Sequence, residues 1–298
     1  MSAVDVSVTI ATWNGQDLLA RCLDSLAATA GAVTHEVIVV DNASADGTRA
    51  MVRERYPAVT LVESPDNEGY ASANGRALQR ARGRYVLVLN NDVTVFPDTL
   101  ARMVAFMDRS PRVGASICAL WPSPDAPGPA PCTGRYFPTA RRILFENLLM
   151  FSGLEALFRR TSWTDLVLGY PADLTREHRV EHISGAFLFV RRETIDQVGP
   201  MDPGYFLYLE ETDWCFRMRR AGWEIAYTPE ARAVHIGAQS TGRLADRAAI
   251  YRQSMERYLR KHHGLLSVWA YRLEVLLVER PLTPLFRLAR RLAGRPPA

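Results

Sequence analysis

Residues 85–92 read Tyr85-Val86-Leu87-Val88-Leu89-Asn90-Asn91-Asp92, a wholly apolar run that leads directly into three polar side chains. A short apolar run rich in valine predicts a strand that is buried on both faces, as in a parallel sheet covered by helices. Ligands of such sheets bind beyond the carboxyl ends of the strands. The polar triplet therefore predicts a binding site where this strand ends.

The segments before this strand alternate between strand-like and helix-like patterns. Strands that alternate with helices predict an α/β fold with a doubly wound, mostly parallel sheet and flanking helices. Thr12, Asn14 and Asp41 follow the first two strands, so they should reach the same edge as Asn90-Asn91-Asp92. The predicted strands cover 6–11, 36–40 and 59–62, and the predicted helices cover 17–26, 48–56 and 71–81.

The second half of the chain is less regular. Six prolines from Trp121 through Pro138 predict that this stretch has no regular structure. We interpret residues 121–180 as an insertion that covers one edge of the site, and we expect one domain over 1–242 and a helical extension over 243–298. Further predicted elements are an apolar helix at 143–158, strands at 182–190 and 231–234, and helices at 210–220 and 251–263.

Composition excludes several classes of protein. Of the 298 residues, 48% are hydrophobic and 23% are charged, as in a soluble globular protein. Lys261 is the only lysine and precedes a histidine, which excludes a G-x-x-x-x-G-K-[ST] phosphate loop and a lysine Schiff base elsewhere. The cysteines form no C-x-x-C pair, so we expect no structural zinc, and Cys22 and Cys215 lie in helical patterns that favour buried packing.

We also expect no signal peptide and no membrane span. The N-terminus has no basic stretch before its first apolar run, and no apolar run reaches the roughly 18 residues of a membrane span. We therefore expect a cytoplasmic protein.

The last segment, 281–298, carries an amphipathic pattern without acidic residues. It fits either a helix on an anionic membrane surface or an ordinary surface helix packed on its own domain. In the first case the protein is peripheral on the inner face of the cell membrane. The apolar positions are Leu285, Leu288, Ala289 and Leu292, and the basic positions opposite them are Arg287, Arg290 and Arg291.

Candidate catalytic side chains stand near predicted strand and helix ends. Asp92 either binds a divalent cation or caps the next turn. Glu210 and Glu211 follow aromatic residues at a predicted helix start, where they either cap the helix or supply a general base. His235 ends an apolar strand and is either a structural histidine or a ligand to a cation such as Mn²⁺.

Two further residues of the same helix have simpler interpretations. Asp213 is expected to pair with Arg217, four residues further on. Trp214 either offers a flat face to a ligand or packs in the core.

Taken together, the ordered motifs resemble those of family 2 glycosyltransferases with the GT-A fold. The resemblance covers residues 5–242 and extends to the branch that includes rhamnosyltransferases of bacterial surface polysaccharides. Asn90 stands where the D-x-D metal motif of the family has its first aspartate, and Trp13 stands at the place of a usual tyrosine. The matching segments are 8–14, 39–48, Asn67-Glu68-Gly69-Tyr70, Ala73-Asn74, Leu89-Asn90-Asn91-Asp92, Ser184-Gly185-Ala186, 208–213, Arg217 with Ala221-Gly222-Trp223, and Val234-His235 with Ser240.

The resemblance implies a donor side. Asp41 would recognise the nucleotide base, and Asp92 would bind Mg²⁺ or Mn²⁺ on the donor diphosphate, with His235 as a further contact to the metal or diphosphate. The other implied nucleotide-binding residues are Thr12, Asn14, Ser44, Asn67, Asn90 and Asn91.

The resemblance also implies an acceptor side. Glu211 would be the catalytic base, Gly185, Glu210 and Trp214 would contact the acceptor, and 121–180 would be an acceptor-side insertion. The implied reaction is an inverting transfer of a sugar from a nucleotide-diphosphate donor to a hydroxyl of a glycan or polyprenyl-linked acceptor. No nucleic-acid partner is expected, because the arginines are interspersed with acidic residues.

Alternatives from other classes remain at this point. A nucleotidyltransferase would share the sheet and the metal, although it usually has a basic glycine-rich loop that Asn14-Gly15-Gln16 lacks. A non-catalytic relative that binds sugar nucleotides is favoured by Asn90. A dinucleotide oxidoreductase is excluded, because no G-x-G-x-x-G follows the first strand.

Overall fold

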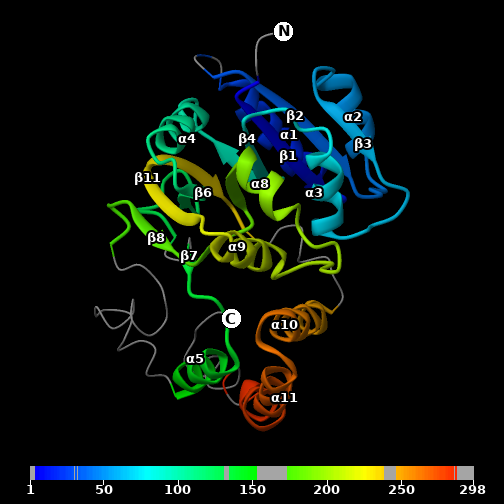
Figure 1. The fold of residues 1–298 in the computed structure, drawn as a ribbon. Coiled ribbons are helices and arrows are strands. Elements are labelled where there is room, and N and C mark those ends of the chain that lie inside the picture. Colours follow the sequence, from blue (N-terminus) through cyan, green and yellow to red (C-terminus); the bar gives the residue numbers. More distant parts are fainter. Residues whose placement is uncertain are drawn as a thin grey trace.

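The structure, a computed structural model, describes residues 4–29, 31, 33–130, 134–152, 173–237, 246–284 and 286. Over these residues a large mixed sheet is flanked by helices, and a further layer of helices lies at the end of the molecule away from the N-terminus (Figure 1). The strands are β1 (Val6–Thr12), β2 (His35–Asp41), β3 (Thr60–Glu63), β4 (Tyr85–Asn90), β5 (Val93–Val95), β6 (Val113–Trp121), β7 (Gly134–Arg135), β8 (His178–Val180), β9 (His182–Ile183), β10 (Phe187–Arg191) and β11 (Glu224–His235). The helices are α1 (Gln16–Ala27), α2 (Thr48–Arg55), α3 (Tyr70–Leu78), α4 (Thr99–Asp108), α5 (Ala140–Ser152), α8 (Arg192–Val198), α9 (Glu210–Arg220), α10 (Arg247–His263), α11 (Leu265–Glu274) and the π-helix η2 (Val275–Glu279).

The sheet is parallel on one side, and its first antiparallel strand, β10, lies next to β4. Its strands run in the order β3-β2-β1-β4-β10-β6-β11-β5, and β8 pairs with β11. β3, β2, β1 and β4 are parallel, with Thr12 opposite Asp41 and Ala11 opposite Asn90. Chain order reverses between β1 and β4, and a reversal of this kind opens a crevice beyond the carboxyl ends of the two strands. The α/β fold and the shared edge of these residues are therefore confirmed.

Burial explains why the central strands are apolar. Val8 and Ile10 of β1 and Leu87 and Leu89 of β4 have no exposed surface, because helices cover the sheet. On α1, leucines and Cys22 recur at helical spacing and face this core. Cys22 and Cys215 are buried as predicted.

The strand predicted at 182–190 is wrong in its extent. β9 ends at Ile183, a turn occupies 184–186, and β10 begins at Phe187. The turn has a partner outside the sheet, since the Tyr70 hydroxyl donates to the Gly185 carbonyl at 2.9 Å. β10 also runs antiparallel to β4 and β6, which the apolar pattern alone did not predict.

The helical layer joins two distant parts of the chain. α5 comes from the segment predicted as an insertion, and its Asn147 donates to Glu274 of α11 at 2.7 Å. α10 is tied to the loop before α9, because the Ser254 hydroxyl donates to the Leu207 carbonyl at 2.8 Å. The layer is thus fixed next to the start of α9, and the boundary near residue 242 stays a prediction.

Some predictions concern residues that the structure does not describe. Cys132, Ser240, residues 153–158 of the predicted apolar helix, and all of 281–298 apart from 281–284 and 286 lie outside the described residues. Among the helices that are described, none combines the length and the hydropathy that a membrane crossing needs.

Candidate functional site

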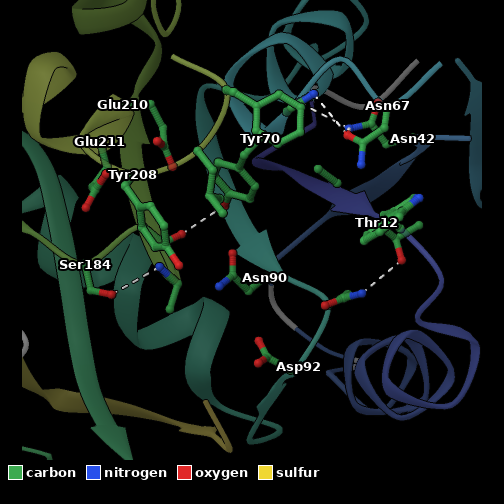
Figure 2. Close-up of a pocket in the computed structure, with 18 of the residues that line it drawn as sticks. Thr12, Asn42, Asn67, Tyr70, Asn90, Asp92, Ser184, Tyr208, Glu210 and Glu211 are labelled. Atoms are coloured by element: carbon green, nitrogen blue, oxygen red, sulfur yellow. Dashed lines mark hydrogen bonds between the residues drawn. The ribbon is translucent and has the colours of Figure 1, made fainter. Parts of the chain in front are cut away.

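A cavity of about 470 Å³ opens at the switch point, beyond the ends of β1 and β4. Its volume lies in the usual range of small-molecule sites. Figure 2 shows two glutamates of α9 on one side, polar residues of the strand ends and loops on the other, and Asn90 and Asp92 between them. The predicted site residues that line the cavity are Thr12, Asn67, Asn90, Asn91, Asp92, Gly185, Glu210, Glu211 and His235. The predicted site residues that do not line it are Asn14, Asp41, Ser44 and Trp214.

The floor of the cavity is built where β4 ends. The Asn91 amide donates to the Thr12 hydroxyl at 2.9 Å, and the Asn90 backbone N–H donates to the Ala186 carbonyl at 3.0 Å. A Cβ at Gly15 would lie 2.4 Å from the Asn91 amide nitrogen, so glycine there leaves room for this contact. The strand end is therefore held in place on both sides.

Asp92 and His235 form a pair in the wall of the cavity. Asp92 is almost fully buried, and its Oδ1 has no hydrogen-bond partner. His235 Nε2 lies 3.3 Å from that oxygen. A buried carboxylate oxygen without a donor beside an imidazole nitrogen fits a divalent cation that takes its other ligands from water or a diphosphate. No larger cluster of candidate metal ligands occurs among the described residues.

Asp41 lies beside the cavity, at the end of β2. Arg49 Nε donates to Asp41 Oδ2 at 2.5 Å, and the Ser44 backbone N–H donates to the same oxygen at 3.1 Å. Asp41 Oδ1 is buried and has no hydrogen-bond partner. A buried acceptor of this kind suits recognition of an N–H group of a ligand.

Asn14 and Ser44 connect the loops that follow β1 and β2. The Ser44 hydroxyl accepts from the Asn14 backbone N–H at 2.9 Å, and the Asn14 side-chain oxygen accepts from the Ala45 N–H at 2.7 Å. These bonds brace the two loops against each other. The nucleotide contacts predicted for both residues stay predictions.

Asn42 is a site residue to which sequence reasoning gave no role. Its amide nitrogen donates to Asn67 Oδ1 at 2.8 Å and to the Gly69 carbonyl at 3.2 Å, while its oxygen accepts from the Glu68 N–H at 3.0 Å. Asn42 thereby shapes the loop at 67–69, and all three of these bonds go to loop atoms. Its place directly after Asp41, in the matching segment 39–48, was the only signal for it.

Gly69 brings the two walls of the cavity together. Its φ is +83°, and a Cβ there would lie 2.3 Å from the Phe206 carbonyl oxygen. The next residue, Tyr70, donates its backbone N–H to the same carbonyl at 2.7 Å. Only glycine allows this approach without displacing backbone atoms.

Strained backbone precedes the two glutamates. Tyr208 and Leu209 have φ of 70° and 67°, a left-handed conformation that costs a non-glycine residue of the order of 1–3 kcal/mol. The Tyr208 ring meets the Tyr251 ring edge-on, with centroids 5.8 Å apart, and lines the cavity. The turn starts α9 so that Glu210 and Glu211 occupy its first two positions.

Glu210 and Tyr70 are shifted toward their neutral forms. Burial raises the pKa of Glu210 well above its usual value, and the adjacent Glu211 adds to the effect. Burial also raises the pKa of Tyr70, with Glu210 and Glu211 acting in the same direction. The Tyr70 hydroxyl therefore stays a donor to the Gly185 carbonyl, and a Cβ added at Gly185 would lie 3.6 Å from the Glu211 side chain.

A second cavity, of about 380 Å³, lies between the start of α9, β9 and the helical layer. Its lining includes Arg142 and Asn147 of α5 and Tyr271 of α11. Both cavities are lined by Ser184, Tyr208 and Glu211. The Glu211 side chain therefore borders both spaces.

The predicted acceptor contact of Trp214 is wrong. Trp214 has no exposed surface, and its indole N–H donates to the Gly199 carbonyl at 2.8 Å, so it packs in the core. Trp214 stands four residues after Glu210, so it lies on the same buried face of α9. The predicted Asp213–Arg217 pair is confirmed, with Arg217 Nε 2.9 Å from Asp213 Oδ2.

Asp213 also anchors α10. Lys261 Nζ and His262 Nε2 each lie 2.7 Å from Asp213 Oδ1. Burial opposes ionisation of this carboxyl, but the hydrogen bonds from His262, Lys261 and Arg217 outweigh burial and hold its pKa well below the usual value. An ionised Asp213 thus fixes the helical layer to α9.

Comparison with known proteins connects this site to sugar transfer. The family model described as "Glycosyl transferase family 2" matches residues 7–166. The N-acetylglucosaminyl-diphospho-decaprenol L-rhamnosyltransferase of Mycobacterium tuberculosis is 32% identical over 243 residues, which cover 76% of this chain and 75% of that protein. The rhamnosyltransferase WbbL of Escherichia coli is 24% identical over 151 residues, which cover 51% of this chain and 52% of that protein.

A solved structure has the same fold. The mannosyltransferase PcManGT from Pyrobaculum calidifontis, in complex with GDP-Man and Mn²⁺, superposes with a TM-score of 0.59 at 20% identity, covering 98% of this chain and 76% of that one. At this level of identity the likeness shows the fold alone.

Proposed function

Since the chain belongs to glycosyl transferase family 2, we propose that it is an inverting, metal-dependent glycosyltransferase of cell-surface polysaccharide synthesis. The donor is a nucleotide-diphosphate sugar, with rhamnose as the expected sugar, and the acceptor is a hydroxyl of a glycan or polyprenyl-linked saccharide. The observation that carries the proposal is the position of Glu211, whose side chain borders both cavities. Family membership favours this reaction over nucleotidyl transfer.

The first cavity is assigned to the donor. Beside it Asp41 keeps a buried oxygen without a partner, which suits an N–H of the nucleotide base. Thr12, Asn67 and Asn91 add hydroxyl and amide groups to its wall. Asn14 and Ser44 join the loops that follow β1 and β2, and we assign both to contacts with the nucleotide.

The diphosphate would lie over Asn90, Asn91 and Asp92. Asp92 and His235 would hold Mg²⁺ or Mn²⁺, since they place an unpartnered oxygen and an imidazole nitrogen at one point. When bound, such an ion stabilises the negative charge that develops on the leaving diphosphate. Asn90 brings an uncharged amide to the place where the D-x-D motif of the family has its first aspartate. Of the two motif positions, 90 and 92, only Asp92 therefore supplies a carboxylate.

Glu211 is assigned as the general base. The acceptor oxygen forms its bond to the anomeric carbon as the bond from that carbon to the diphosphate oxygen breaks, and the hydroxyl proton passes to the Glu211 carboxylate. Attack from the side opposite the diphosphate inverts the anomeric centre. Glu210 is a poorer base in its resting state, because burial and Glu211 favour its neutral form.

The second cavity is assigned to the acceptor. It opens from Glu211 toward α5, α10 and α11, and its lining mixes aromatic rings with polar groups such as Arg142 and Asn147. Aromatic faces with a few polar groups are the usual lining of saccharide-sized sites. The relative from Mycobacterium tuberculosis is named for a diphospho-decaprenol acceptor, which supports a polyprenyl-linked acceptor for this chain.

A thermal-shift screen tests the proposal. Uridine, guanosine and thymidine diphosphate sugars, rhamnose included, are added with and without Mn²⁺. Because a ligand of the native state raises the melting temperature, we expect a rise with one donor class, larger with Mn²⁺. No rise with any donor would contradict the donor assignment. A donor that binds but is neither transferred nor hydrolysed would indicate the non-catalytic relative instead.

A further inference from the structure

The helices of the outer layer turn an apolar face to solvent. On α11 and η2, six large apolar side chains are exposed at spacings of one, three or four residues. At about 100° per residue, these spacings place all six within about a third of the helix circumference. Leu266 is 85% exposed, the highest value among them. The six are Leu265, Leu266, Trp269, Leu273, Leu276 and Leu277.

α5 extends this surface. Its Leu144, Phe145 and Leu148 are exposed, at spacings that share one side of the helix. Figure 1 shows α5 beside α11 at the end of the molecule away from the N-terminus, and the Asn147–Glu274 hydrogen bond joins the two helices. We refer to these nine side chains of α5, α11 and η2 as the apolar face.

The exposed charged residues that border the apolar face have one sign. Over the described residues 140–152 and 265–284, the exposed charged residues are Arg141, Arg272 and Arg280, and none is acidic. The acidic residues of these helices are all buried to some degree. Glu274 is buried, Glu146 is partly buried and lines the second cavity, and Glu279 is partly buried with Arg252 Nη1 3.4 Å from its carboxylate. The sequence continues this bias, since residues 280–298 contain no aspartate or glutamate.

We propose that the apolar face seats the protein on a membrane surface that contains anionic lipids. Interfacial helices combine apolar side chains, which enter the acyl boundary, with arginines that contact lipid phosphates. Both components are present on one side of this layer. A symmetric contact with a second copy fits less well, because the exposed charged residues that meet across it would all be arginines, and Arg272 is already paired with Glu256 of its own chain.

The apolar face lies next to the second cavity, so membrane binding would affect how the acceptor reaches the site. Ile143 and Asn147 of α5 and Tyr271 of α11 line the second cavity, while neighbouring residues of the same helices form the apolar face. Seating would therefore bring this cavity close to the lipid surface, where a lipid-linked acceptor presents its head group. This consequence rests on the proposed function, whereas membrane binding itself does not.

Vesicle flotation of the full chain tests the proposal. The vesicles contain either phosphatidylcholine alone or an equal mixture of phosphatidylcholine and phosphatidylglycerol. The variant Leu266→Glu/Leu277→Glu places two negative charges in the apolar face. The control Ala50→Glu/Gln79→Glu adds the same charge at exposed positions of α2 and directly after α3. A milder variant, Leu266→Ser/Leu277→Ser, replaces the first if that one fails to fold.

We expect the wild-type protein and the control to float with the mixed vesicles, less with phosphatidylcholine alone, and less at high salt. The face variant should lose about tenfold or more in binding, with an unchanged melting temperature, because both leucines are exposed. Wild-type protein that stays in the aqueous phase, or a face variant that floats like wild type, would overturn the proposal. So would a lipid-free dimer that the face variant abolishes, which would assign the face to a second copy. Donor-induced thermal shifts are independent of all these outcomes.

Discussion

His235 Nε2 lies 3.3 Å from Asp92 Oδ1. The two residues meet where the end of β11 pairs with β5, which directly follows β4. The Asp92 oxygen is buried and receives no hydrogen bond. Two residues far apart in the sequence thus present an oxygen and a nitrogen to the same cavity, which is the arrangement that a divalent cation on a diphosphate would use.

Asp92→Asn tests this pair, because it removes the charge and keeps the shape. With Mn²⁺ present, we expect the affinity for the nucleotide-sugar donor, measured by calorimetry, to fall by about tenfold or more. His235→Gln should weaken binding in the same direction. In a chelator, wild type and both variants should bind the donor alike. Equal affinity of wild type and Asp92→Asn with Mn²⁺ would argue against the metal assignment.

Gly69→Ala should disturb the contact between the two walls of the donor cavity. Its φ of +83° and the 2.3 Å approach of a Cβ to the Phe206 carbonyl require backbone movement. We expect a loss of about 1–3 kcal/mol in unfolding free energy and weaker donor binding. Gly75→Ala is the control, because it lies in α3 with open space around it, and it should stabilise by up to about 1 kcal/mol. Equal behaviour of the two variants in urea unfolding would refute this account.

Asp213 should make the stability of the fold depend on pH in the acidic range. Its pKa is lower in the folded state than in the unfolded chain, so its carboxylate stabilises the fold above about pH 4, and this contribution is lost as the pH falls toward the folded-state pKa. At pH 7, Asp213→Asn should lose about 3 kcal/mol. The gap to wild type should narrow below about pH 4 in urea titrations.

The exposed pair Asp98–Arg102 provides a matched control, since it has the same i, i+4 spacing at the start of α4. Asp98→Asn should change stability by less than about 0.5 kcal/mol at either pH. A gap between wild type and Asp213→Asn that stays constant down to pH 3 would show that ionisation of Asp213 does not stabilise the fold.

Trp214→Phe should lower stability without changing the KM for the acceptor. The change leaves the Gly199 carbonyl without its indole donor and opens a void in the core. We expect a loss of about 1–3 kcal/mol in unfolding free energy, with the KM for acceptor unchanged within about twofold. Trp269→Phe, at a position 63% exposed, should cost less than about 0.5 kcal/mol. A raised acceptor KM with unchanged stability would return Trp214 to the acceptor site.

The fold could be predicted where pattern and environment agree. The apolar runs of β1 and β4 identify a covered parallel sheet, and α9 was predicted with its observed bounds at 210–220. The antiparallel β10 could not be predicted, because strand direction depends on which neighbours a strand pairs with and leaves no trace in its own apolar run. The turn after β9 likewise accepts a hydrogen bond from Tyr70, far away in the chain, and the local sequence gives no sign of this contact.

The site was predictable to a similar degree. Residues at strand ends, such as Asn90 and Asp92, follow from topology, since parallel strands end at one edge. Asn42 acts by shaping a neighbouring loop, and Trp214 shows that a residue only three positions after Glu211 can face the core instead. The second cavity depends on α5 meeting α11, a long-range contact that periodicity cannot reveal.

The role of Glu211 between the two cavities is tested most directly by single-turnover transfer with Glu211→Gln. Donor affinity and the transfer rate are measured on the same protein preparation, with Mn²⁺ present and Glu210→Gln as the neighbouring control. We expect Glu211→Gln to slow transfer by about 10²–10⁴-fold with donor affinity within about twofold of wild type, and Glu210→Gln to retain more of the rate. Transfer at the wild-type rate by Glu211→Gln would contradict its assignment as the base.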